Sequence, residues 1–391
     1  MTAAKMARID SPDALAELVS DCAGRSCPIV DYGLAHEGLG HRPPDHHVRL
    51  VQAGGLLEHY RRDMTVRVAA GMTLGDLQAQ LEPHGQFLPI DADSDLTLGE
   101  LINHNVYGPL RVGYGALRDL LLGLRYIDGA GRQIHVGGRT VKNVAGYDLT
   151  RFMVGSLGQF GIVYEATLRT YAIPGSTSTV QMRLSNPARL DDMLSDWLLT
   201  DAAPTWLSMV MTRQPDATVH SGFFGGRTAC QVQERALEGI VQGHGELTID
   251  EISQRDLAAD AAQRTALRRW RRHATGLCKL IVPPASTGAV VRGLGAWSSD
   301  QIPITIEALP VHGCIFAGGG LDARQAGELD RQVAGLVEPL GGLRIWYQRP
   351  EGADTIDPVG SPPPHLSTLV RLKRTMDPDD LFNPGRFCPA A

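Results

Sequence analysis

The chain has 391 residues, of which 43% are hydrophobic and 20% are charged, and its formal net charge is −6. This length is typical of two or three domains, and the composition is that of a globular protein with sizeable hydrophobic cores. A negative net charge argues against nucleic acid as the main partner. The one basic run, Arg268–Arg272, is expected to form a solvated helix face or a contact with another subunit.

The six cysteines are scattered and form no Cys-x-x-Cys pair, so the sequence carries no zinc or iron–sulfur motif. Sparse thiols are typical of the reducing cytoplasm. Residues 1–10 lack the apolar core of a secretory signal, and no apolar run approaches the roughly 20 residues that span a bilayer. We therefore expect a cytoplasmic protein without a transmembrane segment, for which any membrane association would be peripheral or through partners.

The first 90 residues predict alternating helices and strands. Ser11 followed by Pro12 is a typical helix start, and Thr73 is a second N-cap. Apolar periodicity then predicts helices over 11–23 and 73–83 and strands over 27–30, 64–70 and 85–89.

The segment 96–119 has the pattern of an anion-binding turn. Thr97 can cap a helix whose free N–H groups and positive dipole end face an anion, and Gly99 lets the first turn approach it closely. The helix is expected to end near 105–109. Glu100 suits the helix dipole at this position, but its carboxylate would repel a phosphate.

A hairpin of strands 120–128 and 132–136 leads into a second glycine-rich stretch at 138–174. Here a short helix is followed by Gly155, Gly158 and Gly161, and then by a predicted strand over 162–170. Without Cβ atoms, such turns let backbone N–H groups approach a phosphate or sugar. The loop precedes the strand, which is the reverse of the Rossmann order, so we predict a nucleotide site of another fold. An unrelated NAD or phosphate binder would instead need a strand before Gly155.

The second half of the chain repeats one order of elements. The first series is strand 178–184, helix 187–199, strands 206–212 and 218–224, and helix 228–243. After a helical segment at 252–273, the second is strand 277–282, helix 286–299, strands 303–309 and 312–317, helix 322–338 and strand 343–348. This order indicates an α+β domain of ferredoxin-like type, with a mostly antiparallel sheet and helices on one face.

Several motifs resemble one protein family. The Val-Lys-Asn-Val-Ala-Gly-Tyr-Asp segment at 141–148 and the Gly-Ser-Leu-Gly-Gln-Phe-Gly-Ile loop at 155–162 resemble the FAD-binding domain of the vanillyl-alcohol oxidase / p-cresol methylhydroxylase (PCMH) superfamily. More narrowly, they are similar to the FAD-binding subunits of bacterial glycolate oxidases. Gly-Tyr-Gly-Ala-Leu-Arg-Asp at 113–119 and Phe-Asn-Pro-Gly-Arg at 382–386 fit the same family.

The resemblance implies FAD as the cofactor and a set of residues that contact it. These are Thr97, Leu98, Gly99, Asn103, Asn105, Gly108, Pro109, Gly115, Arg118, Asp119, Lys142, Asn143, Gly146, Tyr147, Asp148, Gly155, Ser156, Gly158, Gly161, Ile162 and Asn383. It also implies an α+β architecture with a two-subdomain PCMH-type FAD-binding domain at 1–175. An α+β cap domain for substrate or subunit contact is expected at 176–348, and a C-terminal segment at 349–391 that packs back on the FAD domain.

The activity that the resemblance implies is flavin-mediated oxidation of glycolate, a small 2-hydroxy acid, to glyoxylate. The expected partners are a second FAD-binding glycolate oxidase subunit and an iron–sulfur subunit. Spacing does not fix the catalytic base or the carboxylate clamp, for which the candidates are Arg111, Arg118, Tyr147, His312 and Arg344.

One alternative stays open. The family carries consecutive glycines in its first phosphate loop, whereas residues 31–40 of this chain contain only scattered ones. The chain could therefore be a flavin-poor structural subunit that retains the fold and docks the catalytic flavoprotein and iron–sulfur subunits.

Overall fold

The computed structural model describes residues 5–23, 29–31, 46–50, 55–139, 148–200, 202–212, 216–299, 302–360 and 365–385. The chain forms two compact units. The first comprises Met1–Tyr107, Gly115–Ile173 and Pro363–Ala391, and the second Gly108–Tyr114 and Pro174–Pro362. Residues 108–114 and 349–362 thus lie in the second unit, whereas the sequence predicts them in the FAD domain and in the returning C-terminal segment.

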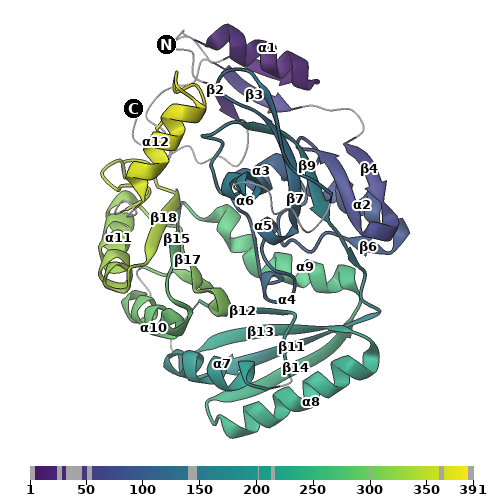
Figure 1. The fold of residues 1–391 in the computed structure, drawn as a ribbon. Coiled ribbons are helices and arrows are strands. Elements are labelled where there is room, and N and C mark those ends of the chain that lie inside the picture. Colours follow the sequence, from purple (N-terminus) through teal and green to yellow (C-terminus); the bar gives the residue numbers. More distant parts are fainter. Residues whose placement is uncertain are drawn as a thin grey trace. The chain divides into compact units, whose positions relative to one another are not determined.

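One layer of the first unit is a small parallel sheet with a helix beside it (Figure 1). Its strands pair in the order β1 (Lys5–Ile9), β3 (His46–Leu50) and β2 (Ile29–Asp31). Helix α1 (Pro12–Cys22) begins as predicted, because the Ser11 hydroxyl accepts a hydrogen bond from the Ala14 N–H at 3.3 Å. Its apolar side, which includes Leu15 and Val19, belongs to a core shared with Phe382 near the C-terminus.

The other layer is a five-stranded antiparallel sheet. Its order is β4 (Leu56–Tyr60), β5 (Thr65–Ala69), β9 (Ile162–Arg169), β7 (Leu121–Ile127) and β8 (Gln133–Gly137). The central strand β9 is buried at every residue except Arg169, because apolar cores lie on both of its faces. Helices cover one face: α2 (Leu74–Leu81), α3 (Leu98–Asn103), α5 (Leu117–Leu120) and α6 (Leu149–Met153).

Short elements complete this unit. Strands β6 (Gln86–Phe87) and β10 (Tyr171–Ala172) form a two-stranded ladder, and α12 (Leu366–Met376) returns the chain near its end. A helix, α6, precedes Gly155, and a strand, β9, follows Gly161. This order excludes the alternative of an unrelated NAD or phosphate binder.

The second unit is built on an eight-stranded antiparallel sheet with mirrored halves. The strand order is β14-β11-β13-β12-β16-β17-β15-β18. The first half contains β11 (Ser176–Leu184), α7 (Leu190–Leu198), β12 (Trp206–Met211), β13 (Ala217–Gly225), α8 (Arg227–Gly243) and β14 (Leu247–Arg255). The second half contains β15 (Gly276–Ile281), α10 (Thr287–Trp297), β16 (Thr305–Leu309), β17 (Cys314–Gly319), α11 (Ala323–Val337) and β18 (Leu343–Gln348). Each half is a complete β-α-β-β-α-β unit, which confirms the ferredoxin-like repeat.

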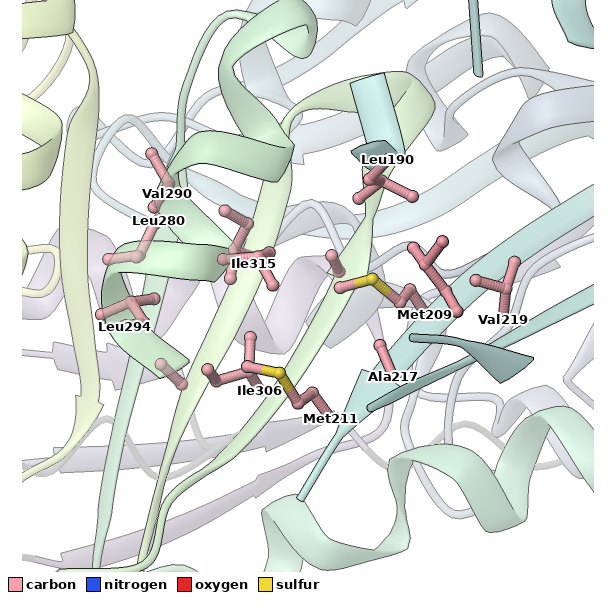
Figure 2. Close-up of a cluster of buried hydrophobic side chains, with 14 of the residues drawn as sticks. Leu190, Met209, Met211, Ala217, Val219, Leu280, Val290, Leu294, Ile306 and Ile315 are labelled. Carbon is pink, nitrogen blue, oxygen red and sulfur yellow. The ribbon is translucent and has the colours of Figure 1, made fainter. Parts of the chain in front are cut away.

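The two halves join through β12 and β16, which pair from Met209↔Ala308 to Met211↔Ile306. Alternate residues of both strands enter one core together with helices α7, α8, α10 and α11. Figure 2 shows this core at the junction, where side chains of both halves meet, among them Leu190, Met211, Leu294 and Ile306. A short helix, α4 (Arg111–Tyr114), comes from the inserted segment.

The prediction of a helical segment over 252–273 is wrong at its start. Strand β14 runs to Arg255 and pairs with β11, and helix α9 (Leu257–Arg268) begins only after Asp256, its N-cap. The prediction that helices lie on one face is also incomplete. Trp206 points away from the core residues of β12 and donates from Nε1 to Asp260 of α9 at 3.0 Å, so α9 lies on the opposite face (Figure 1).

Within the part of the chain that the structure describes, no helix has the length and hydropathy needed to cross a membrane.

Candidate functional site

The two stretches predicted to form the FAD site lie side by side in the first unit. The Gly155 N–H donates to the Ile102 carbonyl at 2.8 Å, and the Leu157 N–H donates to the Asn103 carbonyl, also at 2.8 Å. The end of α3 and the glycine turn after α6 are therefore joined by main-chain hydrogen bonds. Asn383 reaches the same turn from the C-terminal segment, since its Nδ2 donates to Leu157 O at 3.0 Å.

Backbone strain is concentrated where these segments meet. Asn105, Leu157 and Asn383 have φ values of 47°, 54° and 43°, and Gly155 and Gly158 have 81° and 68°. A left-handed backbone is unusual for a bulky residue such as leucine, and each such residue costs on the order of 1–3 kcal/mol. Strain of this kind persists where the surrounding structure fixes it, and it clusters at ligand-binding sites.

Buried amide oxygens without a protein donor gather at the same place. Asn383 is 2% exposed, and its Nδ2 also donates to Gly158 O at 3.1 Å, so Oδ1 must point away from the turn. Among the residues described, neither Asn383 Oδ1, nor Asn105 Oδ1, nor Gln159 Oε1 has a hydrogen-bond partner. A buried acceptor without a donor is costly, so this set fits a ligand that brings its own donors. The ribityl hydroxyls and flavin imide N–H of FAD are donors of this type.

The anion-binding role predicted for the start of α3 does not agree with its hydrogen bonds. The Leu98 N–H donates to Met72 O at 2.9 Å, and the Gly99 N–H donates to Ala70 O at 2.8 Å. Thr97 and Glu100 form a capping box, in which the Thr97 N–H donates to the Glu100 carboxylate at 2.5 Å. The expectation of free N–H groups at this turn is therefore wrong. Glu100 satisfies the N-cap N–H.

Two of the predicted glycines, Gly158 and Gly161, are required by the protein's own packing. A Cβ on Gly158 would lie 2.3 Å from Asn383 Nδ2, and one on Gly161 would lie 2.6 Å from the Tyr126 ring. A Cβ on Gly99 would lie 3.4 Å from Ala70, an ordinary van der Waals contact, so packing does not require this glycine. Gly158 thus makes room for Asn383, and any effect of this glycine on a ligand is indirect.

The other predicted contacts have separate local roles. Asp148 caps α6 by accepting from the Arg151 N–H at 3.0 Å, and Asp119 accepts from the Ala116 N–H at 2.9 Å. Arg118 is largely exposed and lies 4.0 Å from Asp119, a pairing that contributes little. The remaining residues predicted to contact FAD fall into three groups. The first unit contains Gly115, which has a φ of 83°, Ser156, which is 6% exposed, and Ile162, the first residue of β9. The second unit contains Gly108 and Pro109, and the residues outside the described part of the chain are Lys142, Asn143, Gly146 and Tyr147.

Sequence reasoning missed Gln159, which is fully buried in the glycine turn. Its Nε2 donates to the Asn383 carbonyl at 3.4 Å, so it links the turn to the C-terminal segment. A polar amide set between Gly158 and Phe160 in an otherwise small or apolar loop is the signal that could have found it.

The second unit carries a charged cluster on the sheet face that also bears α9. Arg271 donates to Glu307, with atoms 2.9 and 2.6 Å apart, and its guanidinium lies 3.4 Å from the centre of the Phe316 ring. Lys279, 7% exposed, donates to the Tyr347 hydroxyl at 3.4 Å. The signal that sequence reasoning missed is Lys279 itself, a lysine inside the otherwise apolar strand β15. The expectation of a solvated helix face is wrong for Arg268, which is 9% exposed, and for Arg271, which pairs with the buried Glu307.

Two of the candidates for the catalytic base and the carboxylate clamp, His312 and Arg111, are in contact in this unit. Burial, and to a lesser extent the Arg111 guanidinium, lower the pKa of His312 to about 4, so its imidazole is neutral at pH 7. The ring hydrogen-bonds to the Arg111 backbone, and Nε2 has no partner among the described residues. A neutral imidazole with a bare nitrogen can accept a proton. Arg344, by contrast, pairs with Asp330 of α11 and has a structural role.

No group of His, Cys, Asp or Glu side chains in the described ranges is arranged to hold a metal ion.

Comparison with known proteins identifies an FAD-binding domain. A family model described as an FAD binding domain matches residues 3–137. Glycolate oxidase subunit GlcE of Escherichia coli is 30% identical over 97% of both chains. The mitochondrial D-lactate dehydrogenase [cytochrome] of Arabidopsis thaliana is 32% identical over 97% of this chain and 72% of its own.

Solved structures with little sequence similarity share the fold. A glucooligosaccharide oxidase of Acremonium strictum superposes with a TM-score of 0.73 at 16% identity, covering 99% of this chain and 91% of its own. An alkyldihydroxyacetonephosphate synthase gives a TM-score of 0.73 at 16% identity over 97% and 76%. The fold is that of PCMH-type FAD-binding proteins, and the cofactor is FAD. Together with the GlcE match, this shows that the chain belongs to the family of FAD-binding glycolate oxidase subunits.

Proposed function

We propose that this chain is the FAD-binding subunit of a glycolate oxidase complex and takes part in the oxidation of a small 2-hydroxy acid. The observation that carries the proposal is the set of buried, unsatisfied amide oxygens of Asn105, Gln159 and Asn383 around a strained glycine turn. FAD, when bound, supplies the acceptor for the two electrons of the substrate C–H bond. Asn105, Gln159 and Asn383 are the side chains that we expect to hold it.

The second unit carries polar groups whose chemistry suits the binding of a small acid. Lys279 is a cation that can bind a carboxylate, and the hydroxyl of Tyr347 beside it can add a hydrogen bond. Arg271 is paired with Glu307 and, like Arg344, has a structural role. His312 Nε2 is the candidate acceptor for the hydroxyl proton, because it is buried and has no hydrogen-bond partner among the described residues.

Lys279 gives a direct test of substrate binding. Lys279→Met removes the ammonium but keeps a side chain of similar length, so KM for glycolate should rise by about tenfold or more, as expected for a lost charged contact. Lys279→Arg should recover part of the affinity. Steady-state kinetics of the FAD-loaded chain measure both, and an unchanged KM in Lys279→Met would remove Lys279 from the substrate site.

One observation favours a second candidate, a flavin-poor structural subunit. The main-chain N–H groups of Leu98, Gly99, Gly155 and Leu157 already donate within the protein, so these turns offer few amides to a diphosphate. Such a chain would dock the other flavoprotein and the iron–sulfur subunit without taking part in the redox step.

Flavin content decides between the two. We expect the purified chain to show the visible flavin bands, or to gain them stoichiometrically with added FAD, and glycolate or D-lactate to bleach them. A colourless chain that takes up no FAD but still binds its partner subunits would support the structural role. The same preparation tests the proposed partners, a second FAD-binding subunit and an iron–sulfur subunit, by co-purification.

The proposed location follows from this assembly. A chain without a membrane-spanning helix in its described part would work in the cytoplasm and reach the inner membrane through its partner subunits. Fractionation with and without the partner genes tests this proposal, because only the intact complex should sediment with membranes.

A further inference from the structure

A buried lysine lies behind the amide oxygens of the glycine turn. Lys373 of α12 is 3% exposed, and its ammonium donates to Gln159 O and to Phe382 O, both at 2.8 Å. It also forms an ion pair with Asp377, one helical turn later. One ammonium therefore holds the carbonyls of two segments that are more than 200 residues apart in the sequence.

Asp377 extends this arrangement to the end of the described chain. It is 1% exposed, and its carboxylate accepts from the Leu381 N–H at 3.0 Å and the Phe382 N–H at 2.8 Å. These bonds fix the turn that ends at Asn383. The Gly129 N–H donates to Met376 O at 3.0 Å, so the tip of the β7–β8 hairpin supports the same turn from outside.

Anchoring α12 does not by itself require a buried charge. Moving an ion pair out of water costs several kcal/mol per ion, and apolar residues of similar volume often serve stability equally well. Leu369 and Met376 already pack α12 against the apolar core of the unit. The ammonium instead fixes the positions of two backbone segments. The carbonyls that it joins belong to Gln159 and to Phe382, the residue before Asn383.

We infer that the Lys373–Asp377 pair positions the FAD-binding acceptors Gln159 and Asn383. It aligns their backbones, so that the Asn383 amide is held on Leu157 O and Gly158 O and its oxygen faces a ligand. Lys373 is thus a positioning residue that acts through Asn383. The inference rests on the proposed FAD site at the glycine turn.

The chain offers a matched control. Arg264 and Asp260 of α9, in the second unit, also form an i,i+4 ion pair, with side chains 3% and 0% exposed, against 4% and 0% for Lys373 and Asp377. Lys373→Met and Arg264→Met therefore remove similarly buried cations of an i,i+4 ion pair. Lys373 also lies 3.4 Å from Asp380, and Arg264 lies over the rings of Trp206 and Phe224, but only Lys373 touches the FAD-binding segments.

The test compares these variants in the full-length chain by FAD titration, the visible spectrum of the bound flavin, and thermal unfolding. We expect both to lower the melting temperature. Lys373→Met should weaken FAD binding by about tenfold or more, as for one or two lost hydrogen bonds, and shift the flavin spectrum. Lys373→Arg should restore part of the affinity, and Arg264→Met should bind FAD as the wild type does.

Equal FAD affinity in Lys373→Met and wild type would overturn the inference, as would an equal loss in Arg264→Met. If the Lys373→Met protein does not accumulate, FAD titration of Lys373→Arg, Asn383→Gly and the double variant tests the inference instead. Glycine suits position 383, because it keeps the positive φ of Asn383 without strain. Non-additive losses in the double variant support action through Asn383, and additive losses refute it. A wild-type chain that takes up no FAD overturns the proposed site as well.

Discussion

At the glycine turn, neighbouring residues leave no room for a larger side chain. Gly158 combines a φ of 68° with a Cβ position only 2.3 Å from Asn383 Nδ2. Any side chain there must either strain the backbone or displace the amide that closes the turn.

We therefore expect Gly158→Ala to lower the free energy of unfolding by about 1–2 kcal/mol through backbone strain alone and to weaken FAD binding by displacing Asn383. Urea unfolding and FAD titration measure the two effects. Gly239→Ala is the control: Gly239 lies inside α8 with nothing near its Cβ position, so alanine should raise the free energy of unfolding by about 0.5–1 kcal/mol. Normal FAD affinity in Gly158→Ala would contradict the role of Asn383.

Another residue-scale consequence concerns pH. Burial lowers the pKa of His220 to about 4, below its unfolded value of 6.5. Between these values the unfolded chain binds a proton that the folded chain does not, so stability is lost as pH falls from 6.5 towards 4. His220 stands opposite Ser208 and Gln181 on the sheet face away from the second unit's main core.

For His220 the loss should reach on the order of 3 kcal/mol at pH 4, since a tenfold change in a proton-binding constant corresponds to about 1.4 kcal/mol. His220→Leu should make stability less dependent on pH over this range, because it removes the proton that only the unfolded chain takes up. Free energies of unfolding at pH 7 and pH 5 test this expectation. The same pH dependence in variant and wild type would mean that His220 is not the group responsible.

At the scale of elements, helix α3 shows how one sequence pattern can serve two purposes. Its Thr-Leu-Gly-Glu start matches an anion-binding turn, yet its N–H groups and the Glu100 carboxylate are bonded within the protein. Capping explains Glu100 without reference to a phosphate.

Two substitutions separate the capping role of the Glu100 side chain from the effect of its charge on FAD binding. Glu100→Gln keeps a capping-box side chain and removes the charge. We expect unchanged FAD affinity, because the Glu100 carboxylate is bonded to the Thr97 N–H. Glu100→Gly loses the box and should lower the free energy of unfolding by about 1 kcal/mol. Tighter FAD binding in Glu100→Gln would instead show that the carboxylate repels the diphosphate.

Local patterns predict most elements well, and the misses have physical reasons. Strand β9 is expected at 162–170 and lies at Ile162–Arg169, because its buried β-branched run is unmistakable. Strand β14 escapes prediction, since as an edge strand it is half exposed and its residues Asp250–Gln254 are mostly polar. Its pairing with β11 is a long-range contact that no local pattern encodes.

The candidate site is predictable only in part for the same reason. Glycine spacing and the asparagines at 103, 105 and 383 point to segments that the structure brings together. That Lys373 binds the carbonyl of Gln159 depends on two distant segments meeting. That the amides of α3 are already bonded depends on Ala70 and Met72, which precede the motif by a full helix and loop.

At the scale of the whole molecule, the two units differ in how the chain builds them. The second is formed by one continuous stretch, Pro174–Pro362, together with the insert Gly108–Tyr114. The first needs its last segment, which supplies Lys373, Asp377 and Asn383.

Removing residues 377–391 should therefore damage the two units unequally. Without Asp377 the Lys373 ammonium stays buried without its carboxylate, a change that costs about 3–5 kcal/mol, and Asn383 is lost. We expect such a chain to bind no FAD and to unfold in two steps, with the eight-stranded sheet melting last. A single transition with FAD binding intact would show that the C-terminal segment is dispensable.

The split origin of the first unit also bears on its biogenesis. Domains generally fold as units while the ribosome still extends the nascent polypeptide. The five-stranded sheet of the first unit emerges early, but the helix and turn that complete its glycine turn, Leu366–Met376 and the residues up to Gly385, emerge only after the stretch Pro174–Pro362 of the second unit. If FAD binds at the proposed site, we expect its loading to follow the synthesis of this segment, and the intervening ferredoxin-like repeats can finish folding before it begins.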